Sequence, residues 1–275
     1  MQLEFDFVDK KFRITDAENY RLSIQISLNG FSFCVYDAGT DKHLVIKHFS
    51  YTKNIRDEDL WMEEIAEISN IIFADFDSST WCNCLFYTQK NILVPKDVFS
   101  ESCIKDYMSP LFRIGEYDEI NVHYIPEIDS YSCFLMPSRI TMELVSRFDS
   151  VNFFDQTYCC LREMTKKVYR NKMNVIFCGN FINIILYKDN SLILNNSFEV
   201  SNINDVIYFI AAIIRKNEIA KIPIFVSGEI SPANIRELGK FFPNLIQEHD
   251  RKVMVRLGLE TSSRYYSLLM MHKCE

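Results

Sequence analysis

Cysteine and histidine are the residue types of this chain best suited to metal binding or nucleophilic chemistry. Two cysteine pairs lie close together in sequence, Cys82-x-Cys84 and Cys159-Cys160, but zinc sites generally use Cys-x₂-Cys pairs or nearby histidines. Cys82 and Cys84 would share one face of a strand, where a buried cysteine acts as a small apolar residue. The five histidines are dispersed, and none has a glutamate or cysteine at a metal-motif spacing. We expect structural cysteines, no metal site and no catalytic dyad.

The short motifs that mark common enzyme sites do not occur in the sequence. There is no Gly-x-Ser-x-Gly elbow, no Walker-type phosphate loop and no Rossmann fingerprint. Local basic clusters such as Lys166-Lys167 and Arg251-Lys252 are explained by a solvated face. No catalytic residue can be assigned on these grounds.

The composition favours two folded domains and excludes two classes of partner. A chain of 275 residues is longer than the roughly 100 to 200 residues of a usual single core, and 48% apolar residues can bury a large interior. The net charge of −7 opposes non-specific binding to nucleic acid or anionic lipid. The most apolar stretch, residues 206–214, is much shorter than the ~18 residues that span a membrane. We expect no nucleic acid partner and no membrane insertion.

The number of cysteines and the composition of the first residues indicate the cellular compartment that we expect. The nine cysteines are an odd number scattered through apolar runs, a pattern typical of a reducing environment. Residues 1–11 mix acidic and apolar side chains, without the basic start and apolar centre of a signal peptide. We expect a cytoplasmic protein.

The first half of the sequence predicts a meander followed by mixed elements. Residues 20–51 alternate as three strands, with Asn29-Gly30 predicting a type I′ hairpin turn and residues 37–42 a second turn. The elements expected next are a helix that begins at Asp57 or Asp59, a strand at 82–87 and, after Pro95, a short helix at 98–108.

The second half repeats this order. We expect strands up to residue 177 and at 181–187 and 192–200, a helix at 203–214, a strand at 222–226 and a helix opened by Ser231-Pro232. Four residue pairs are separated by 149 positions: Gly30 and Gly179, Asp41 and Asn190, Leu44 and Ile193, and Phe49 and Phe198. We interpret this as an internal duplication, although any two α/β domains could share a meander and a helix.

Duplicated halves of this order resemble the superfamily that contains actin, the Hsp70 chaperones, the hexokinase-like sugar kinases and the bacterial pilus assembly protein PilM. Residues 22–30 (LSIQISLNG) resemble its first phosphate-binding hairpin, and residues 174–181 (NVIFCGNF) its second. Residues 224–229 (IFVSGE) resemble the strand and loop that approach adenosine.

A closer similarity is to an uncharacterised bacterial family, a domain of unknown function assigned this fold, through residues 196–198, 204–208 and 227–229. The resemblance implies an α/β protein of two duplicated ribonuclease H-like (actin-like ATPase) domains. Each would have a mixed sheet led by a three-stranded antiparallel meander and flanked by helices. We place the domains at residues 1–149 and 150–275.

In this fold the cleft between the domains is the candidate binding site. The resemblance places nine residues of this chain there: Gln25, Ser27, Asn29, Gly30, Gly179, Asn180, Ser227, Gly228 and Glu229. The alternative interpretation is that they are polar turn residues of tight hairpins, a common role of Asn and Ser.

These residues depart from the pattern that binds phosphate. Such hairpins use glycines that bring backbone N–H groups close to the phosphate, and a carboxylate that holds hydrated Mg²⁺. Gln25 and Ser27 stand where the superfamily has aspartate and glycine, and only Gly179 remains of the second hairpin's glycine run. Glu229 follows Gly228, and its charge would repel a phosphate. ATP with Mg²⁺ is therefore a disfavoured cofactor.

Three functions follow from these observations. The one we favour is a non-catalytic pseudo-ATPase whose domains form a binding or scaffold platform for an unknown protein partner or a small ligand in the interdomain cleft. The alternative is a divergent ATP-binding protein, an ATPase or kinase, that uses Glu229, Asp37 or Asp205 in place of the absent acid. A third, implied by the likeness to PilM, is an adaptor of pilus or cell-division type that binds a short peptide between the domains.

Overall fold

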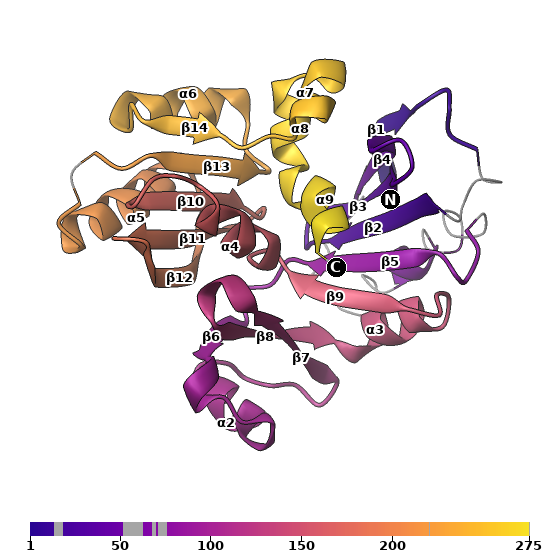
Figure 1. The fold of residues 1–275 in the computed structure, drawn as a ribbon, viewed down its shortest axis with the longest axis horizontal. Coiled ribbons are helices and arrows are strands. Elements are labelled where there is room, and N and C mark those ends of the chain that lie inside the picture. Colours follow the sequence, from indigo (N-terminus) through magenta and orange to yellow (C-terminus); the bar gives the residue numbers. More distant parts are fainter. Residues whose placement is uncertain (14–18, 52–62, 68–69, 71–75, 220, 275) are drawn as a thin grey trace.

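The computed structural model describes residues 1–13, 19–51, 63–67, 70, 76–219 and 221–274. Two lobes, each built on a β-sheet, lie on either side of a column of C-terminal helices, and a smaller sheet lies below them (Figure 1). The α/β architecture with two mixed sheets agrees with the prediction. No helix in the described ranges is long and apolar enough to cross a membrane.

The first sheet has the strand order β1-β4-β3-β2-β5-β9. Its strands are β1 Gln2–Val8, β2 Tyr20–Ile26, β3 Gly30–Asp37, β4 Lys42–Ser50, β5 Trp81–Phe86 and β9 Val151–Asp155. The predicted meander is antiparallel, β5 runs parallel to β2, and β9 runs parallel to β5. β1 and β9 were not predicted. β9 follows the proposed domain boundary at residue 149 yet pairs with the first sheet, and the boundary itself stays a prediction.

The second sheet has the order β12-β11-β10-β13-β14. Its strands are β10 Lys172–Phe177, β11 Phe181–Lys188, β12 Ser191–Glu199, β13 Ile224–Gly228 and β14 Leu245–Gln247, with helices α5 Ile203–Lys216 and α6 Pro232–Phe241. Every predicted element of this half is present. Asn202 caps α5 and Ser231 caps α6, because each side chain accepts a hydrogen bond from a backbone N–H of the first turn.

The two meanders are equivalent, but with two different offsets. In the first hairpin of one copy, the Ser27 N–H donates to the carbonyl oxygen of Gly30; in the other copy, the Cys178 N–H donates to that of Phe181. These equivalent bonds are separated by 151 positions. After the second turn the offset is 149, because Ile182 pairs with Phe198 as Phe31 pairs with Phe49. The second turn of the first copy is two residues longer, which explains the change.

One of the four predicted matches is therefore wrong. Gly30 corresponds to Phe181, and Gly179 corresponds to Leu28, whereas the three later pairs are aligned correctly. Asn29 corresponds to Asn180, since their carbonyl oxygens accept from Tyr51 and Val200 at the same step of the ladder.

The predicted type I′ turn at Asn29-Gly30 is also wrong. A type I′ turn requires positive φ at both central residues, and neither Asn29 nor Gly30 has it. The Ser27 hydroxyl instead accepts a hydrogen bond from the N–H of Asn29, which stabilises a turn without positive φ. In the second copy Asp189 and Asn190 both have positive φ, at 51° and 68°, as a type I′ turn requires.

The small sheet, with the order β6-β8-β7, was not predicted. Its strands are β6 Asn91–Pro95, β7 Asp118–Ile125 and β8 Ser130–Pro137, and the neighbouring helices are α2 Ile104–Met108, α3 Ser138–Val145 and α4 Tyr158–Thr165. Val94, Met108, Cys133 and Leu135 form a separate core here. The helix expected at 98–108 is α2 preceded by short 3₁₀ turns.

The helix expected from Asp57 or Asp59 begins outside the described residues. Residues 63–67 and 70 are helical, and Ile65 is buried.

The C-terminal helices pack between the two lobes. They are α7 Arg251–Leu257, α8 Leu259–Arg264 and α9 Tyr266–Met270. α9 contacts β2 and β3 of the first sheet and β13 of the second (Figure 1). Tyr265, Tyr266, Leu268, Leu269 and Met270 are all buried, so the apolar C-terminal segment packs on the body of the protein.

Candidate functional site

The predicted cleft residues lie at the carboxyl ends of β2, β10 and β13. Gln25 is on β2, and Ser27 to Gly30 form the turn that follows it. Within the second sheet, Phe177 of β10 pairs with Gly228 of β13, so the loops after these two strands lie side by side. This is the edge at which open α/β sheets usually bind ligands.

One contact joins the two lobes at this edge. The side-chain amide of Asn29 donates a hydrogen bond of 3.0 Å to Oε2 of Glu229. Gly179, whose φ is +82°, lies directly beneath that amide, because a Cβ placed on it would overlap the Asn29 side chain. An amide of the first lobe and a carboxylate of the second therefore meet at this edge, above Gly179.

The environment of Glu229 opposes a bound anion. Burial raises the pKa of Glu229, while the hydrogen bond from Asn29 favours its ionised form. Its second oxygen, Oε1, is buried and has no hydrogen-bond partner among the described residues. An ionised Glu229 would repel a phosphate.

The remaining predicted residues have local roles or none that can be assigned. The Ser27 hydroxyl bonds to the main chain of Asn29 and Gly30, and the main chain of Gly30 packs against Phe49. Asn180 is an exposed turn residue. Gln25 and Ser227 are buried, and Gln25 Oε1 and Ser227 Oγ lack a partner among the described residues. The structure thus brings Asn29, Gly179, Gly228 and Glu229 together.

The proposed substitute acids serve local turns. Asp37 accepts hydrogen bonds from the N–H of Gly39 and the hydroxyl of Thr40. Asp205 forms the capping box of α5 with Asn202. Neither carboxylate is part of the cleft contact around Glu229.

The C-terminal helices hold the lobes together beside this contact. Lys252 forms an ion pair with Asp41, and Arg256 forms one with Asp9. Ser263 and Ser267 are buried between the lobes, and the thiol of Cys34 lies 3.8 Å from the carbonyl oxygen of Leu268.

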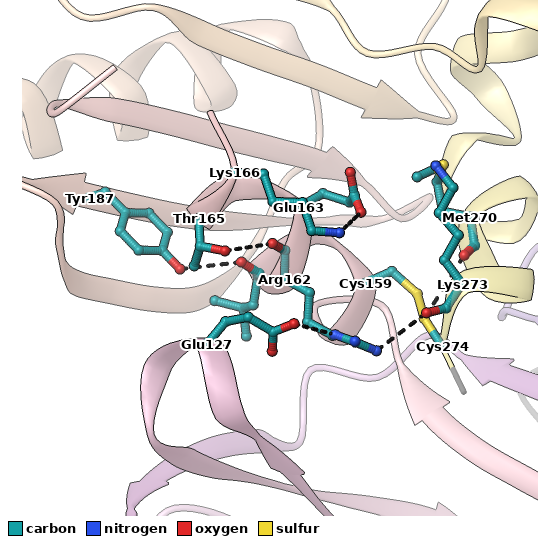
Figure 2. A network of polar contacts seen from close by, with 11 residues as sticks. Glu127, Cys159, Arg162, Glu163, Thr165, Lys166, Tyr187, Met270, Lys273 and Cys274 are labelled. Carbon is teal, nitrogen blue, oxygen red and sulfur yellow. Dashed lines mark hydrogen bonds and ion pairs between the residues drawn. A yellow bond between two sulfur atoms is a disulfide. The ribbon is translucent and has the colours of Figure 1, made fainter. Parts of the chain in front are cut away.

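The cysteines are mainly buried. Cys82 and Cys84 of β5 are fully buried, as predicted, and burial raises the pKa of both thiols. Cys159 of α4 and Cys274 form a disulfide, which was not predicted (Figure 2). Within the described ranges there is no group of three or more His, Cys, Asp or Glu residues that could hold a metal ion.

A groove lies away from the cleft contact, between the second sheet and the small sheet. Its volume is about 870 Å³, and its walls include residues 190–196 of β12 and its turn, and Asn91, Ile92, Leu93 and Pro95 of β6. Tyr187, Thr165 and Glu127 also line the groove. Glu127 forms an ion pair with Arg162 of α4 (Figure 2). None of the nine predicted cleft residues lines this groove.

The sequence matches, over residues 9–245, the family model described as a protein of unknown function (DUF3822). The chain belongs to this family. No curated protein matches the DUF3822 chain in sequence.

Solved structures confirm the actin-like ATPase fold of the DUF3822 chain. A Bacteroides thetaiotaomicron protein with actin-like ATPase fold and unknown function superposes with a TM-score of 0.81 at 16% identity, covering 96% of this chain and 99% of the other. A chain of a PilM–PilN type IV pilus biogenesis complex gives a TM-score of 0.62 at 9% identity, covering 93% and 98%. The ethanolamine utilization protein EutJ from Carboxydothermus hydrogenoformans gives 0.51 at 9% identity, covering 91% and 89%.

Two features of the DUF3822 chain were not found from its sequence. The groove depends on β6 and β12 approaching across about 100 residues, which no local pattern encodes. Asp155 is fully buried at the end of β9 and accepts four hydrogen bonds, from Ser132, Thr157 and Tyr158. The run Asp155-Gln156-Thr157 before a helix was the available signal, since Asp caps helices.

Proposed function

We propose that this DUF3822 chain is a non-catalytic protein of the actin-like fold that acts by binding a protein partner. The observation that carries the proposal is the contact of Asn29 with Glu229 above Gly179. In a phosphate-binding cleft, glycine N–H groups and a metal-holding carboxylate surround the space for the ligand. In this chain the Asn29 amide of the first lobe and the Glu229 carboxylate of the second instead bond to each other.

Two further observations support the proposal. Gln25, which stands where the superfamily has a metal-holding aspartate, is buried and neutral. A chain of similar fold is part of the PilM–PilN complex, so a two-lobed body of this shape is compatible with work as a protein-binding component.

Isothermal titration of the full chain with ATP, with and without Mg²⁺, tests the proposal. We expect no saturable heat up to millimolar nucleotide. A thermal-shift series gives an independent readout, because a ligand at 100 times its Kd stabilises the native state by about 2.7 kcal/mol. Mg²⁺-dependent ATP binding at micromolar affinity would overturn the proposal and favour the ATPase or kinase alternative.

The variant Asn29→Ala separates two reasons for the absence of binding. If the Asn29 side chain alone closes the site, this variant should bind nucleotide. If the lost aspartate and glycines matter as well, as we expect, Asn29→Ala should give the same flat titration as the wild type.

A further inference from the structure

Both long walls of the groove are edge strands. β12 is the outermost strand of the second sheet, and β6 is the outermost strand of the small sheet. The two strands approach each other but belong to separate sheets (Figure 1). Residues of both strands line the groove. An edge strand has unpaired backbone N–H and C=O groups that can pair with another chain.

The pairing pattern shows which main-chain groups of β12 are free. The Val200 N–H donates to the carbonyl of Asn180, which makes Phe181 and Glu199 a non-hydrogen-bonded pair. Because such pairs alternate along an antiparallel ladder, Asn195 and Ser197 also turn their main-chain groups away from β11. Asn195 lies in the wall of the groove.

The same argument applies to β6 from both of its ends. Leu135 donates to the carbonyl of Lys90, and Lys96 donates to that of Asp129. These bonds make Asn91 and Leu93 members of non-hydrogen-bonded pairs with β8, so their main-chain groups face away from β8. Both residues line the groove.

Two side-chain amides in the groove also lack partners. Asn91 is only 7% exposed, and its Nδ2 has no hydrogen-bond partner among the described residues. Oδ1 of Asn195, on the opposite wall, is buried and likewise without a described partner. An amide can both donate to and accept from a peptide group, so these side chains suit a ligand with alternating N–H and C=O groups.

The charged groups of the groove are already paired. The hydrogen bond and charge of Arg162 outweigh burial and hold the pKa of Glu127 below its usual value. The ammonium group of Lys172 donates to the carbonyl of Lys167. The exposed apolar side chains of Leu111 and Ile193 add an apolar surface to the wall. The groove therefore favours an uncharged main chain over a phosphate or a nucleic acid.

We infer that this groove binds an extended peptide segment of a partner protein, which adds a strand to the free edge of β12 and faces β6 across the groove. The inference rests on the proposed function and names the partner's chemistry. β6 has five residues, about 17 Å at roughly 3.4 Å per residue, so a segment of about five residues would fill the paired region.

The test uses a displayed library of linear nine-residue peptides, selected on the full wild-type chain. We expect uncharged, extended peptides to be selected, and we measure their affinity by fluorescence anisotropy. Hydrogen exchange then locates the site, because strand addition should protect the outward amides in the groove wall, such as those of Asn195, Asn91 and Leu93. A selection that yields no binding peptide, or protection confined to other segments, would overturn the inference.

Three variants identify the mode of binding. Asn195→Pro removes an outward N–H without removing a bond to β11, and should lower the affinity at least tenfold. Glu199→Pro, at the other end of the same edge and outside the groove wall, is the matched control and should change it less than twofold. If Asn195→Pro is poorly folded by circular dichroism, Ile193→Asp places a charge in the groove and should give the same loss. Equal affinity in Asn195→Pro and wild type would overturn strand addition.

Sedimentation of the chain alone tests whether a second copy of the chain, and not a partner peptide, binds at the edge of β12. If the wild type forms a dimer that Asn195→Pro abolishes, the occupant of the edge is a second copy, and the assignment to a partner peptide is wrong. The nucleotide titration is independent of this result: ATP binding with peptide binding retained would overturn the proposed function and leave the groove assignment standing.

Discussion

Asp155→Ala should be among the most destabilising single substitutions in this protein, at about 3 to 5 kcal/mol. Asp155 is 1% exposed. Its Oδ1 accepts from the N–H and the hydroxyl of Thr157, both at 2.6 Å, and from the N–H of Tyr158, and its Oδ2 accepts from the Ser132 hydroxyl at 2.5 Å. One carboxylate thus connects β9 of the first sheet, β8 of the small sheet and the start of α4.

The magnitude follows from the groups that lose a partner. Asp155 accepts from two backbone N–H groups at the start of α4, and losing such an acceptor, as for loss of a helix cap, costs about 0.5 to 2 kcal/mol. The hydroxyls of Ser132 and Thr157 would remain buried without their acceptor, at about 1 to 3 kcal/mol each. These contributions overlap, which gives the expected total. In a chain of this size the loss corresponds to a fall in Tm of roughly 2 to 4 °C per kcal/mol.

The free energy of unfolding is measured with urea for the wild type and for Asp155→Ala, Asp155→Asn and Asp77→Ala. Asp155→Asn keeps an acceptor oxygen and should lose less than Asp155→Ala. Asp77 is the matched control, because its carboxylate also accepts from the N–H two residues ahead but is exposed. Asp77→Ala should lose less than about 1 kcal/mol. If Asp155→Ala and Asp77→Ala unfold at the same urea concentration, the reasoning about buried partners is wrong.

Two further outcomes are expected. Burial and the Arg264 guanidinium lower the pKa of His48 to about 4. Between pH 6.5 and 4, His48 is therefore protonated in the unfolded chain but neutral in the native state. As the pH falls from 6.5 to 4, this residue should lower the free energy of unfolding by about 1.4 kcal/mol per pH unit. The variant His48→Gln should reduce the slope of the pH profile, measured by urea unfolding, by that amount. Gly228→Ala should lose about 1 to 3 kcal/mol more stability than Gly258→Ala, because both have positive φ but only a Cβ at 228 would overlap the main chain of Phe177. Equal melting temperatures of the two variants would refute this.

The sequence was a good guide to elements whose pattern is local. Alternating strands and the apolar face of α5 were predicted because each pattern extends over a whole element. β6, β7 and β9 were missed because they are short or only partly buried, so alternation is weak: all but one residue of β7 have intermediate burial. Their pairing is fixed by distant neighbours, such as Cys82 beside Val151.

The candidate site was predicted less completely than the fold, for a different reason. The resemblance located the hairpins, but the contact of Asn29 with Glu229 joins residues 200 positions apart and depends on how the lobes meet. The type I′ turn at Asn29-Gly30 failed because the Ser27 hydroxyl, which the dipeptide rule ignores, stabilises another turn. A close approach to β4, not a left-handed conformation, requires glycine at position 30.

The two hairpins occupy equivalent places in their sheets but make different contacts. Asn29 and Asn180 are equivalent, yet only Asn29 reaches the other lobe, while Asn180 stays in solvent. The residues before them, Leu28 and Gly179, are also equivalent, and glycine occurs where the Asn29 side chain must pack. A larger residue at 179 would displace Asn29 from Glu229, and loss of Asn29 would leave the partly buried Glu229 carboxylate without its donor. Each of these three residues therefore constrains the other two, and the contact between the lobes depends on both copies of the hairpin.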